Sequence, residues 1–194
     1  MLELVYPAGG APVLPAAARF KSKTGAAVEW LPVVEPSGEV VAQAPREFVH
    51  SAGNVLHPVV HLQIINRFGG IYLQKRSEKK DLLPGYWDTA VGGHVGYGET
   101  VMEALFREAR EELGLNDFNP IPLDSYINET SSERELVAVF AIVGNFEPHP
   151  DLDEVADGDW WTEERISSAI GQGLLTPNFE EEYGRIKDAL EALL

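Results

Sequence analysis

The sequence contains no cysteine in its 194 residues, which excludes disulfide frameworks, thiolate zinc sites and cysteine nucleophiles. Basic residues are also scarce: 15 Lys and Arg stand against 31 Asp and Glu, which gives a net charge of −16. A charge of this sign repels a nucleic-acid backbone unless the basic residues gather in one groove. We therefore expect no nucleic-acid polymer as a partner, whereas a bound divalent cation would let an acidic protein accept a small phosphorylated molecule.

Long hydrophobic runs are missing as well. No stretch approaches the ~18 apolar residues that a membrane span requires. The apolar start of the chain lacks a basic segment and is interrupted by Pro7, Gly9 and Gly10, so it does not read as a signal peptide. We expect no membrane association and, by default, a cytoplasmic location. The 44% of hydrophobic residues is nevertheless enough for the core of one globular domain.

The chain divides into an irregular N-terminal arm, residues 1–26, and a single domain, residues 27–194, that ends in a C-terminal helix. Short β-prone runs separated by turn residues predict strands at 28–35, 39–44, 59–65, 71–74, 87–91, 121–128, 135–143 and up to 161. Apolar periodicity and capping residues predict helices beginning near 99 and covering 162–171 and 179–194. Strands outnumber helices and alternate with them irregularly, so the expected fold class is α/β of the α+β type, with a mixed β-sheet sandwiched between helices.

Three carboxylates lie on one face of the helix that begins near residue 99. Glu108, Glu111 and Glu112 stand at positions i, i+3 and i+4, which places them together beside the apolar stripe. Oxygen ligands of this kind suit a hard cation, and Mg²⁺ in particular, since Mg²⁺ needs few protein ligands and bridges phosphate oxygens. The alternative is an ordinary solvated acidic helix face.

The wider context of this helix resembles the Nudix box, G-x5-E-x7-R-E-U-x-E-E-x-G-U, at every constrained position. The matching residues are Gly93, Glu99, Arg107, Glu108, Ala109, Glu111, Glu112, Gly114 and Leu115. The resemblance implies a loop–helix–loop on an α/β/α sandwich, so that 27–194 would be one Nudix domain, and an activity that cleaves diphosphate linkages with Mg²⁺ or Mn²⁺.

The resemblance also suggests roles for the box residues. Three carboxylates, those of Glu108, Glu111 and Glu112, would bind the metal, and the backbone of Gly93 would approach it. Glu112 is the first candidate for a combined ligand and base, with a base from another loop as the alternative. Arg107 is expected to orient Glu99 or Glu111. We expect Glu111 and Glu112 to face outward, so that their replacement leaves the fold intact.

Outside the box, residues 73–88 resemble a segment of type I isopentenyl diphosphate isomerases in which an Arg and a Lys contact the substrate diphosphate. By that match Arg76 and Lys80 are substrate-binding residues. Four of the 15 basic residues lie between positions 75 and 80, which independently suits an anionic ligand. The alternative is a solvated strand end whose charges are balanced locally.

The same isomerases bind a metal through three histidines and a Glu-x-Glu pair, and the corresponding residues here are His50, His57, His94, Glu133 and Glu135. Imidazole combined with carboxylate suits Mn²⁺ or Zn²⁺, so a second metal site is expected. The alternative is a set of unrelated surface histidines with two glutamates that flank a hairpin. Two further histidines, His61 and His149, match no motif and are interpreted as structural.

One departure from the isomerase pattern decides between the activities. The pattern needs a cysteine two residues before its glycine-adjacent histidine, and Gly92 occupies that position. The leading hypothesis is therefore a metal-dependent hydrolase that cleaves a small diphosphate compound, either a nucleoside diphosphate derivative or a prenyl diphosphate. An isomerase-like protein and a non-catalytic metal- or nucleotide-binding module are the alternatives. A homodimer is possible on this sequence, which does not decide the oligomeric state.

Overall fold

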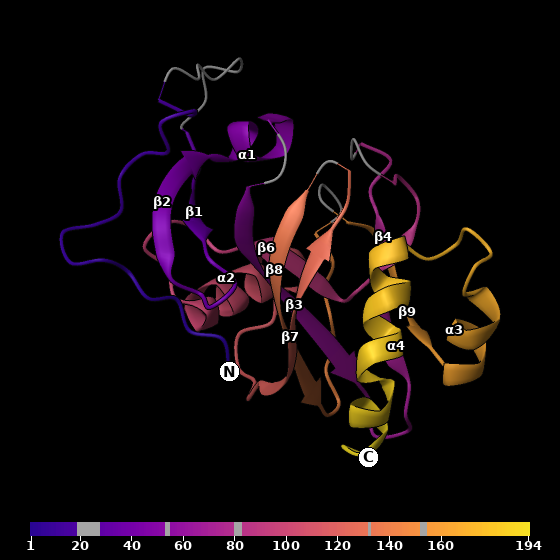
Figure 1. The fold of residues 1–194 in the computed structure, drawn as a ribbon. Coiled ribbons are helices and arrows are strands. Elements are labelled where there is room, and N and C mark those ends of the chain that lie inside the picture. Colours follow the sequence, from indigo (N-terminus) through magenta and orange to yellow (C-terminus); the bar gives the residue numbers. More distant parts are fainter. Residues whose placement is uncertain (19–27, 53–54, 80–82, 132, 152–154) are drawn as a thin grey trace. The chain divides into compact units, whose positions relative to one another are not determined.

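The computed structural model describes residues 1–18, 28–52, 55–79, 83–131, 133–151 and 155–194. It has a mixed α+β fold (Figure 1), which confirms the expected fold class. The helices are α1 (Arg46–Ala52), α2 (Val101–Leu113), α3 (Glu163–Ala169) and α4 (Pro177–Glu191). The strands are β1 (Trp30–Val34), β2 (Val40–Pro45), β3 (Leu56–Ile65), β4 (Ile71–Arg76), β5 (Trp87–Asp88), β6 (Val91–His94), β7 (Ile121–Glu129), β8 (Arg134–Val143) and β9 (Val155–Trp161).

The strands form two sheets. In the smaller sheet β1 pairs with β2 in antiparallel fashion, as the turn residues between them predict. The larger sheet has seven strands in the order β5-β4-β3-β8-β7, with β6 paired to β3 and β9 paired to β4. All ten residues of β3 are buried, which agrees with its central position in this order. The β3–β4 turn closes where Asn66 Oδ1 accepts hydrogen bonds from the backbone N–H groups of Phe68 and Gly70.

Two expectations from the sequence were wrong in detail. The seven-residue helix α1 was not predicted, and the expected strand at 87–91 is interrupted between β5 and β6. The interruption lies at Thr89, which is 2% exposed and turns its hydroxyl inward to donate to the Leu62 carbonyl at 3.1 Å. A side chain that bonds to the neighbouring strand's backbone in this way competes with regular strand geometry.

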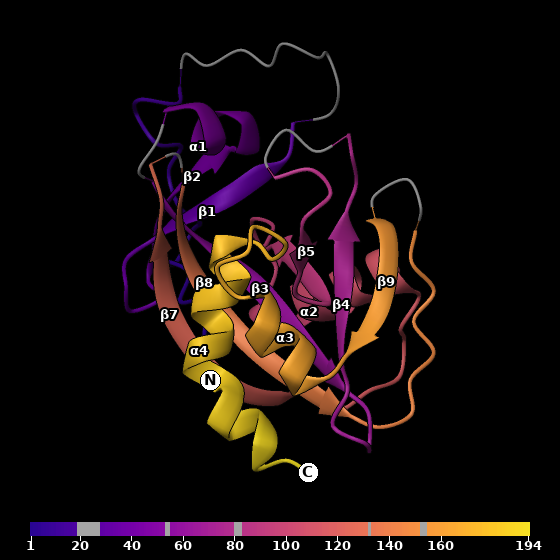
Figure 2. The same cartoon turned by 90° about the vertical axis from the view of Figure 1, so that its right-hand side faces the viewer.

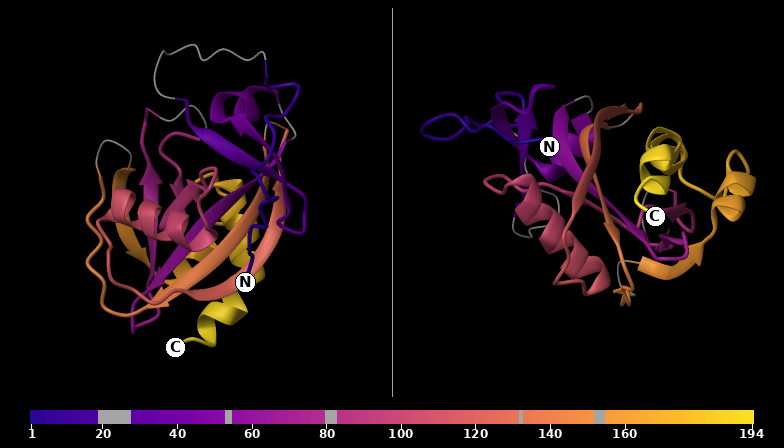
Figure 3. Two further views of the ribbon diagram at one scale, coloured as in Figure 1. Left: turned by 90° about the vertical axis from the view of Figure 1, so that its left-hand side faces the viewer. Right: turned by 90° about the horizontal axis from the view of Figure 1, so that it is seen from below.

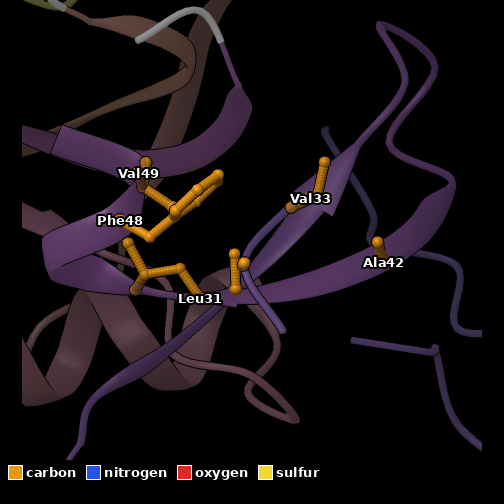
Figure 4. Close-up of a cluster of buried hydrophobic side chains, with 7 residues drawn as sticks. Leu31, Val33, Ala42, Phe48 and Val49 are labelled. Atoms are coloured by element: carbon orange, nitrogen blue, oxygen red, sulfur yellow. The ribbon is translucent and has the colours of Figure 1, made fainter. Parts of the chain in front are cut away.

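The described residues form two compact units, and β3, β6, β7, β8 and α2 each contribute residues to both. The first unit consists of Met1–Val60, Gly93–Leu105 and Ser125–Ala138. Within it, α1 packs on the β1–β2 hairpin through a buried apolar cluster that includes Leu31, Phe48 and Val49 (Figure 4). Burial of these side chains explains why so short a helix is stable, since isolated helices of this length do not persist in water.

The N-terminal segment belongs to the first unit. Its residues 1–18 contain no helix or strand, and they contact the rest of that unit through isolated bridges from Val5 to Glu39 and from Val13 to Gln43. Tyr6 and Ala11 also reach Tyr97: the two tyrosine rings meet edge to face, and the Tyr97 hydroxyl accepts from the Ala11 N–H at 2.7 Å. The segment is therefore bound to this unit by backbone and aromatic contacts.

The second unit consists of His61–Gly92, Phe106–Asp124 and Val139–Leu194. Within it, α4 covers one face of the strands, and the α2 residues of this unit cover the other (Figures 2 and 3). This arrangement matches the expected sandwich of a sheet between helices. Among the described residues, no helix is both long and apolar enough to cross a membrane.

Candidate active site and metal-binding residues

The helix α2 begins and ends at residues whose side chains favour those positions. Thr100 and Glu103 form a capping box: Thr100 Oγ1 accepts from the Glu103 N–H at 3.2 Å, and Glu103 Oε2 accepts from the Thr100 N–H at 2.8 Å. Gly114 ends the helix with a φ of +66°, a conformation that glycine adopts without strain. Leu105 and Ala109 are fully buried on its inner face. The apolar face fixes the rotation of the helix and so the direction of its carboxylates.

Arg107 brings two of these carboxylates together. Its Nη1 donates to Glu108 Oε1 at 2.7 Å and to Glu111 Oε2 at 3.3 Å. The Glu108 side chain is 15% exposed, whereas that of Glu111 is 51% exposed. One guanidinium thus offsets the mutual repulsion of two anions and holds their oxygens in place.

Glu112 has a different environment from the one expected. It is only 6% exposed, so the expectation that it faces outward was wrong. Its Oε2 accepts from the Gly92 N–H and from Gln74 Nε2, both at 3.3 Å. These two donors compensate the carboxylate for the loss of water. The burial depends on residues far away in the sequence, so the helical spacing alone could not indicate it.

Gln74 was not singled out in the sequence, although it contacts the box. The available signal was the strand period of two, which places Gln74 on the same face of β4 as Arg76. Arg76 Nη1 donates to Asp88 Oδ2 at 3.2 Å, and Asp88 Oδ1 accepts from the Thr176 hydroxyl at 3.0 Å. Asp88 therefore fixes the expected phosphate-binding arginine. The other expected substrate contact, Lys80, lies outside the described residues.

The three expected metal-binding histidines lie together in the first unit. His50 comes from α1, His57 from β3 and His94 from β6, and one ring nitrogen of each lies within 4.8 Å of the others. His50 Nε2 is 3.1 Å from His94 Nε2, and His50 Nδ1 is 2.6 Å from Glu133 Oε1. The structure thus assembles these side chains from segments up to 83 residues apart.

His57 is the most deeply buried member of the cluster, at 0% exposure. Its Nδ1 lies 3.0 Å from the Val55 carbonyl, whereas its buried Nε2 has no hydrogen-bond partner in the described structure. Burial lowers the pKa of His57, and the Val55 carbonyl and the Glu135 carboxylate oppose this shift. Glu135 itself accepts from Asn128 Nδ2 at 2.9 Å. The burial favours a neutral ring, which is the form that binds metals.

Comparison with known proteins now decides the family. The NUDIX domain family matches residues 55–183. The chain belongs to the Nudix family. The Nudix hydrolase YfcD of Escherichia coli strain K12 is 34% identical over 143 residues, which cover 74% of this chain and 79% of YfcD. An isopentenyl-diphosphate Delta-isomerase of Mycolicibacterium vanbaalenii is 30% identical over 151 residues, which cover 74% of this chain and 83% of that protein. The resemblance to the isomerase-like branch of the Nudix superfamily is confirmed.

Solved structures share the fold. The crystal structure of DR0079 from Deinococcus radiodurans has a TM-score of 0.72 and 29% identity, covering 81% of this chain and 99% of DR0079. A MutT protein from Methanosarcina mazei has a TM-score of 0.59 at 23% identity, covering 69% of this chain and 94% of its own, which bears on the fold alone. This Nudix chain is therefore a hydrolase by family, and Nudix enzymes generally use divalent metals.

Proposed function

We propose that this Nudix protein hydrolyses a diphosphate linkage in a small phosphorylated compound and requires a divalent metal. The observation that carries the proposal is the environment of Glu112: a buried box carboxylate whose oxygen accepts from the Gly92 amide and from Gln74. A carboxylate kept out of water at the end of a complete Nudix box has no evident structural purpose, because an apolar residue would pack there at lower cost.

The donor set on α2 fits Mg²⁺ or Mn²⁺, since it consists of carboxylate oxygens alone. Glu108, Glu111 and Glu112 would hold the metal. When bound, such an ion neutralises phosphate charge and lowers the pKa of water. Arg107 keeps Glu108 and Glu111 oriented toward a common position.

Basic residues at and after the end of β4 would bind the phosphate groups of the substrate. Arg76 is fixed by Asp88, and its 28% exposed side chain can still present N–H groups to a phosphate. We assign Arg76 and Lys80 to the substrate phosphates. The net charge of −16 favours a small substrate over a polynucleotide.

A second metal site is proposed at the histidine cluster. The buried His57 Nε2 without a hydrogen-bond partner is the kind of atom that a metal would satisfy. Three imidazoles with the carboxylates of Glu133 and Glu135 favour Mn²⁺ or Zn²⁺ over Mg²⁺. His50 and His94, whose Nε2 atoms are 3.1 Å apart, complete the set.

Isopentenyl diphosphate isomerisation is the second candidate function. Relatives named as that isomerase, at 30% and 32% identity, and the histidine cluster favour it. The reaction moves a proton off one carbon and onto another, so it needs an acid and a base on opposite faces of the alkene. Glu135 matches one of these groups, but Gly92 has no side chain to serve as the other. We therefore rank hydrolysis first, with a nucleoside diphosphate derivative or a prenyl diphosphate as the substrate.

A screen of phosphorylated compounds tests the proposal. Purified protein is incubated with nucleoside diphosphate derivatives, nucleotide sugars and prenyl diphosphates in Mg²⁺ or Mn²⁺, and released phosphate is read after coupling to a phosphatase. Metal-dependent phosphate release from at least one compound is expected. If no compound is cleaved while isopentenyl diphosphate is isomerised, the second function replaces the first.

A further inference from the structure

A buried polar network in the second unit has no part in the Nudix box. Its members are His61 and Gln63 on β3, Thr89 between β5 and β6, and Glu182 on α4. All four are less than 9% exposed, and Glu182 is completely buried. Polar groups in such a place are retained only when their hydrogen bonds are made, so the arrangement of these bonds indicates what the network is for.

Glu182 lies at the centre of the network's hydrogen bonds. Glu182 Oε1 accepts from Gln63 Nε2 at 2.7 Å, and Glu182 Oε2 lies 2.7 Å from His61 Nδ1. Gln63 Nε2 also donates to Thr89 Oγ1 at 2.7 Å. An ionised Glu182 accepts at both oxygens and so calls for a proton on His61 Nδ1; in the neutral form of that tautomer Nε2 is the nitrogen that accepts a proton. A buried carboxylate behind an imidazole is the arrangement that orients a histidine base and stabilises its protonated form.

The opposite edge of His61 faces Gly92. A β-carbon built on Gly92 would lie 3.5 Å from His61 Cδ2 and 3.6 Å from His61 Nε2. The amide of the same glycine donates to Glu112 at 3.3 Å. The His61 ring thus lies where a Gly92 side chain would point, and the Glu112 carboxylate is bonded to the Gly92 amide. The network therefore reaches the glycine whose amide is bonded to a carboxylate of the proposed active site.

We propose that His61, positioned by Glu182, is the general base of the hydrolysis. The inference rests on the proposed function. The oxygen of a water molecule forms a bond to phosphorus while the bridging P–O bond breaks and its electron pair leaves with the departing phosphate. The water proton passes to His61 Nε2, the Glu182 carboxylate stabilises the resulting imidazolium, and the proton then returns to solvent. Glu112 remains a metal ligand and is not the base.

Kinetics of His61→Gln test this role. We expect kcat to fall by at least ~10²-fold, the usual contribution of a general base, with KM and the metal concentration needed for activity nearly unchanged. His149→Gln is the matched control, since His149 is exposed and outside the network. Glu182→Gln should lower kcat by at least ~10-fold, because the imidazolium loses its charged partner.

Chemical rescue separates proton transfer from a structural role. In His61→Gly, added imidazoles should restore hydrolysis, and the restored rate should rise with the basicity of the imidazole. Rescue that is independent of basicity would mean that the ring only fills space, and it would overturn the proposal.

Gly92→Ala provides a variant that leaves the network itself unaltered. The added methyl group meets His61 at ordinary van der Waals distance, so the protein should fold while the space beside Nε2 is filled. The substitution should lower kcat in the native background and have little further effect in His61→Gln, because both changes remove the same contact. Equal losses in the two backgrounds would contradict the assignment. Native hydrolysis that survives His61→Gln would overturn this inference alone, whereas absence of any hydrolysis by the native protein would overturn the proposed function with it.

Discussion

Replacement of Glu112 by Gln is the sharpest test of the box assignment. The change removes one negative charge and keeps the shape of the side chain. In the structure Glu112 Oε2 accepts from the Gly92 N–H and from Gln74 Nε2 at 3.3 Å. Because both donors bond to the same oxygen, a glutamine that places its carbonyl oxygen there keeps both hydrogen bonds, now to a neutral acceptor. The perturbation is therefore two weakened hydrogen bonds in a 6% exposed position and one lost metal-ligand charge.

The two effects differ in size, which makes the experiment decisive. Two weakened hydrogen bonds cost about 1–2 kcal/mol of stability, and a domain of ordinary stability, roughly 5–15 kcal/mol, stays more than ~99% folded after that loss. Removal of a ligand charge should lower kcat/KM by at least ~10²-fold, or about 2.7 kcal/mol of transition-state stabilisation. Unfolding cannot account for a loss of activity of that size.

The assay is phosphate release from a confirmed substrate at saturating Mg²⁺, with thermal unfolding measured on the same samples. Glu103→Gln is the matched control: it makes the same chemical change on the same helix, and Gln still forms a capping box with Thr100. We expect this control to retain native activity. Hydrolysis by Glu112→Gln at the native rate would refute the assignment of the site to α2.

Three further predictions concern metals, isomerisation and alkaline stability. Elemental analysis of the purified protein should find bound Mn²⁺ or Zn²⁺, and the His50→Gln variant should contain much less of it. A Mn²⁺-soaked crystal without an anomalous peak between His50, His57 and His94 would contradict this prediction. Incubation with isopentenyl diphosphate should yield no dimethylallyl diphosphate by NMR, because Gly92 offers no proton donor, and rapid isomerisation would favour the second function. Burial, with Asp157 and Asp159, raises the pKa of Tyr72 to about 12. Since Tyr72 in the unfolded chain ionises first, near the ordinary tyrosine pKa of 10.0, stability present below pH ~10 should be lost as pH rises toward 12. Between pH 9 and pH 11 the free energy of unfolding measured in urea should fall by up to ~1.4 kcal/mol more for the native protein than for Tyr72→Phe. Equal decreases in the two proteins would count against the raised pKa of Tyr72.

Much of the fold could be predicted because its signals are local. The hairpins follow from period-two apolar runs and the turn residues between them, and α2 follows from its apolar stripe and from Gly114. The helix α1 gave no such signal. It is seven residues long, and its stability comes from packing of Phe48 and Val49 on β1 and β2. Contacts of that kind are decided by the tertiary structure.

The residues of the candidate site also fall into two groups: those that local spacing can place and those that only the tertiary structure places. Helical spacing placed Glu108 and Glu111 on one face, and Arg107 lies within the same two turns. The burial of Glu112 depends on Gly92 and Gln74, which are 20 and 38 residues away, and no local pattern carries that information.

His61 was interpreted as structural for the same reason. Its partner Glu182 lies 121 residues along the chain. A lone histidine in an apolar strand is usually a satisfied core residue, and only the fold shows which edge of its ring faces Gly92.

The absence of a side chain at Gly92 differs in its physical basis from the absence of one at Gly38. Gly38 has a φ of +87° and its β-carbon would collide with the Glu3 carbonyl, so both backbone and packing require glycine there. Gly92 has neither constraint: its φ lies outside the left-handed range, and the three atoms nearest to a β-carbon there, from His61 and Thr89, would be 3.5–3.6 Å away. The scaffold would therefore accept the methyl group of alanine at this position. Neither backbone conformation nor contact at the β-carbon requires glycine here, so Gly92→Ala changes the contact with His61 without straining the fold, and its effect on hydrolysis reports on that contact.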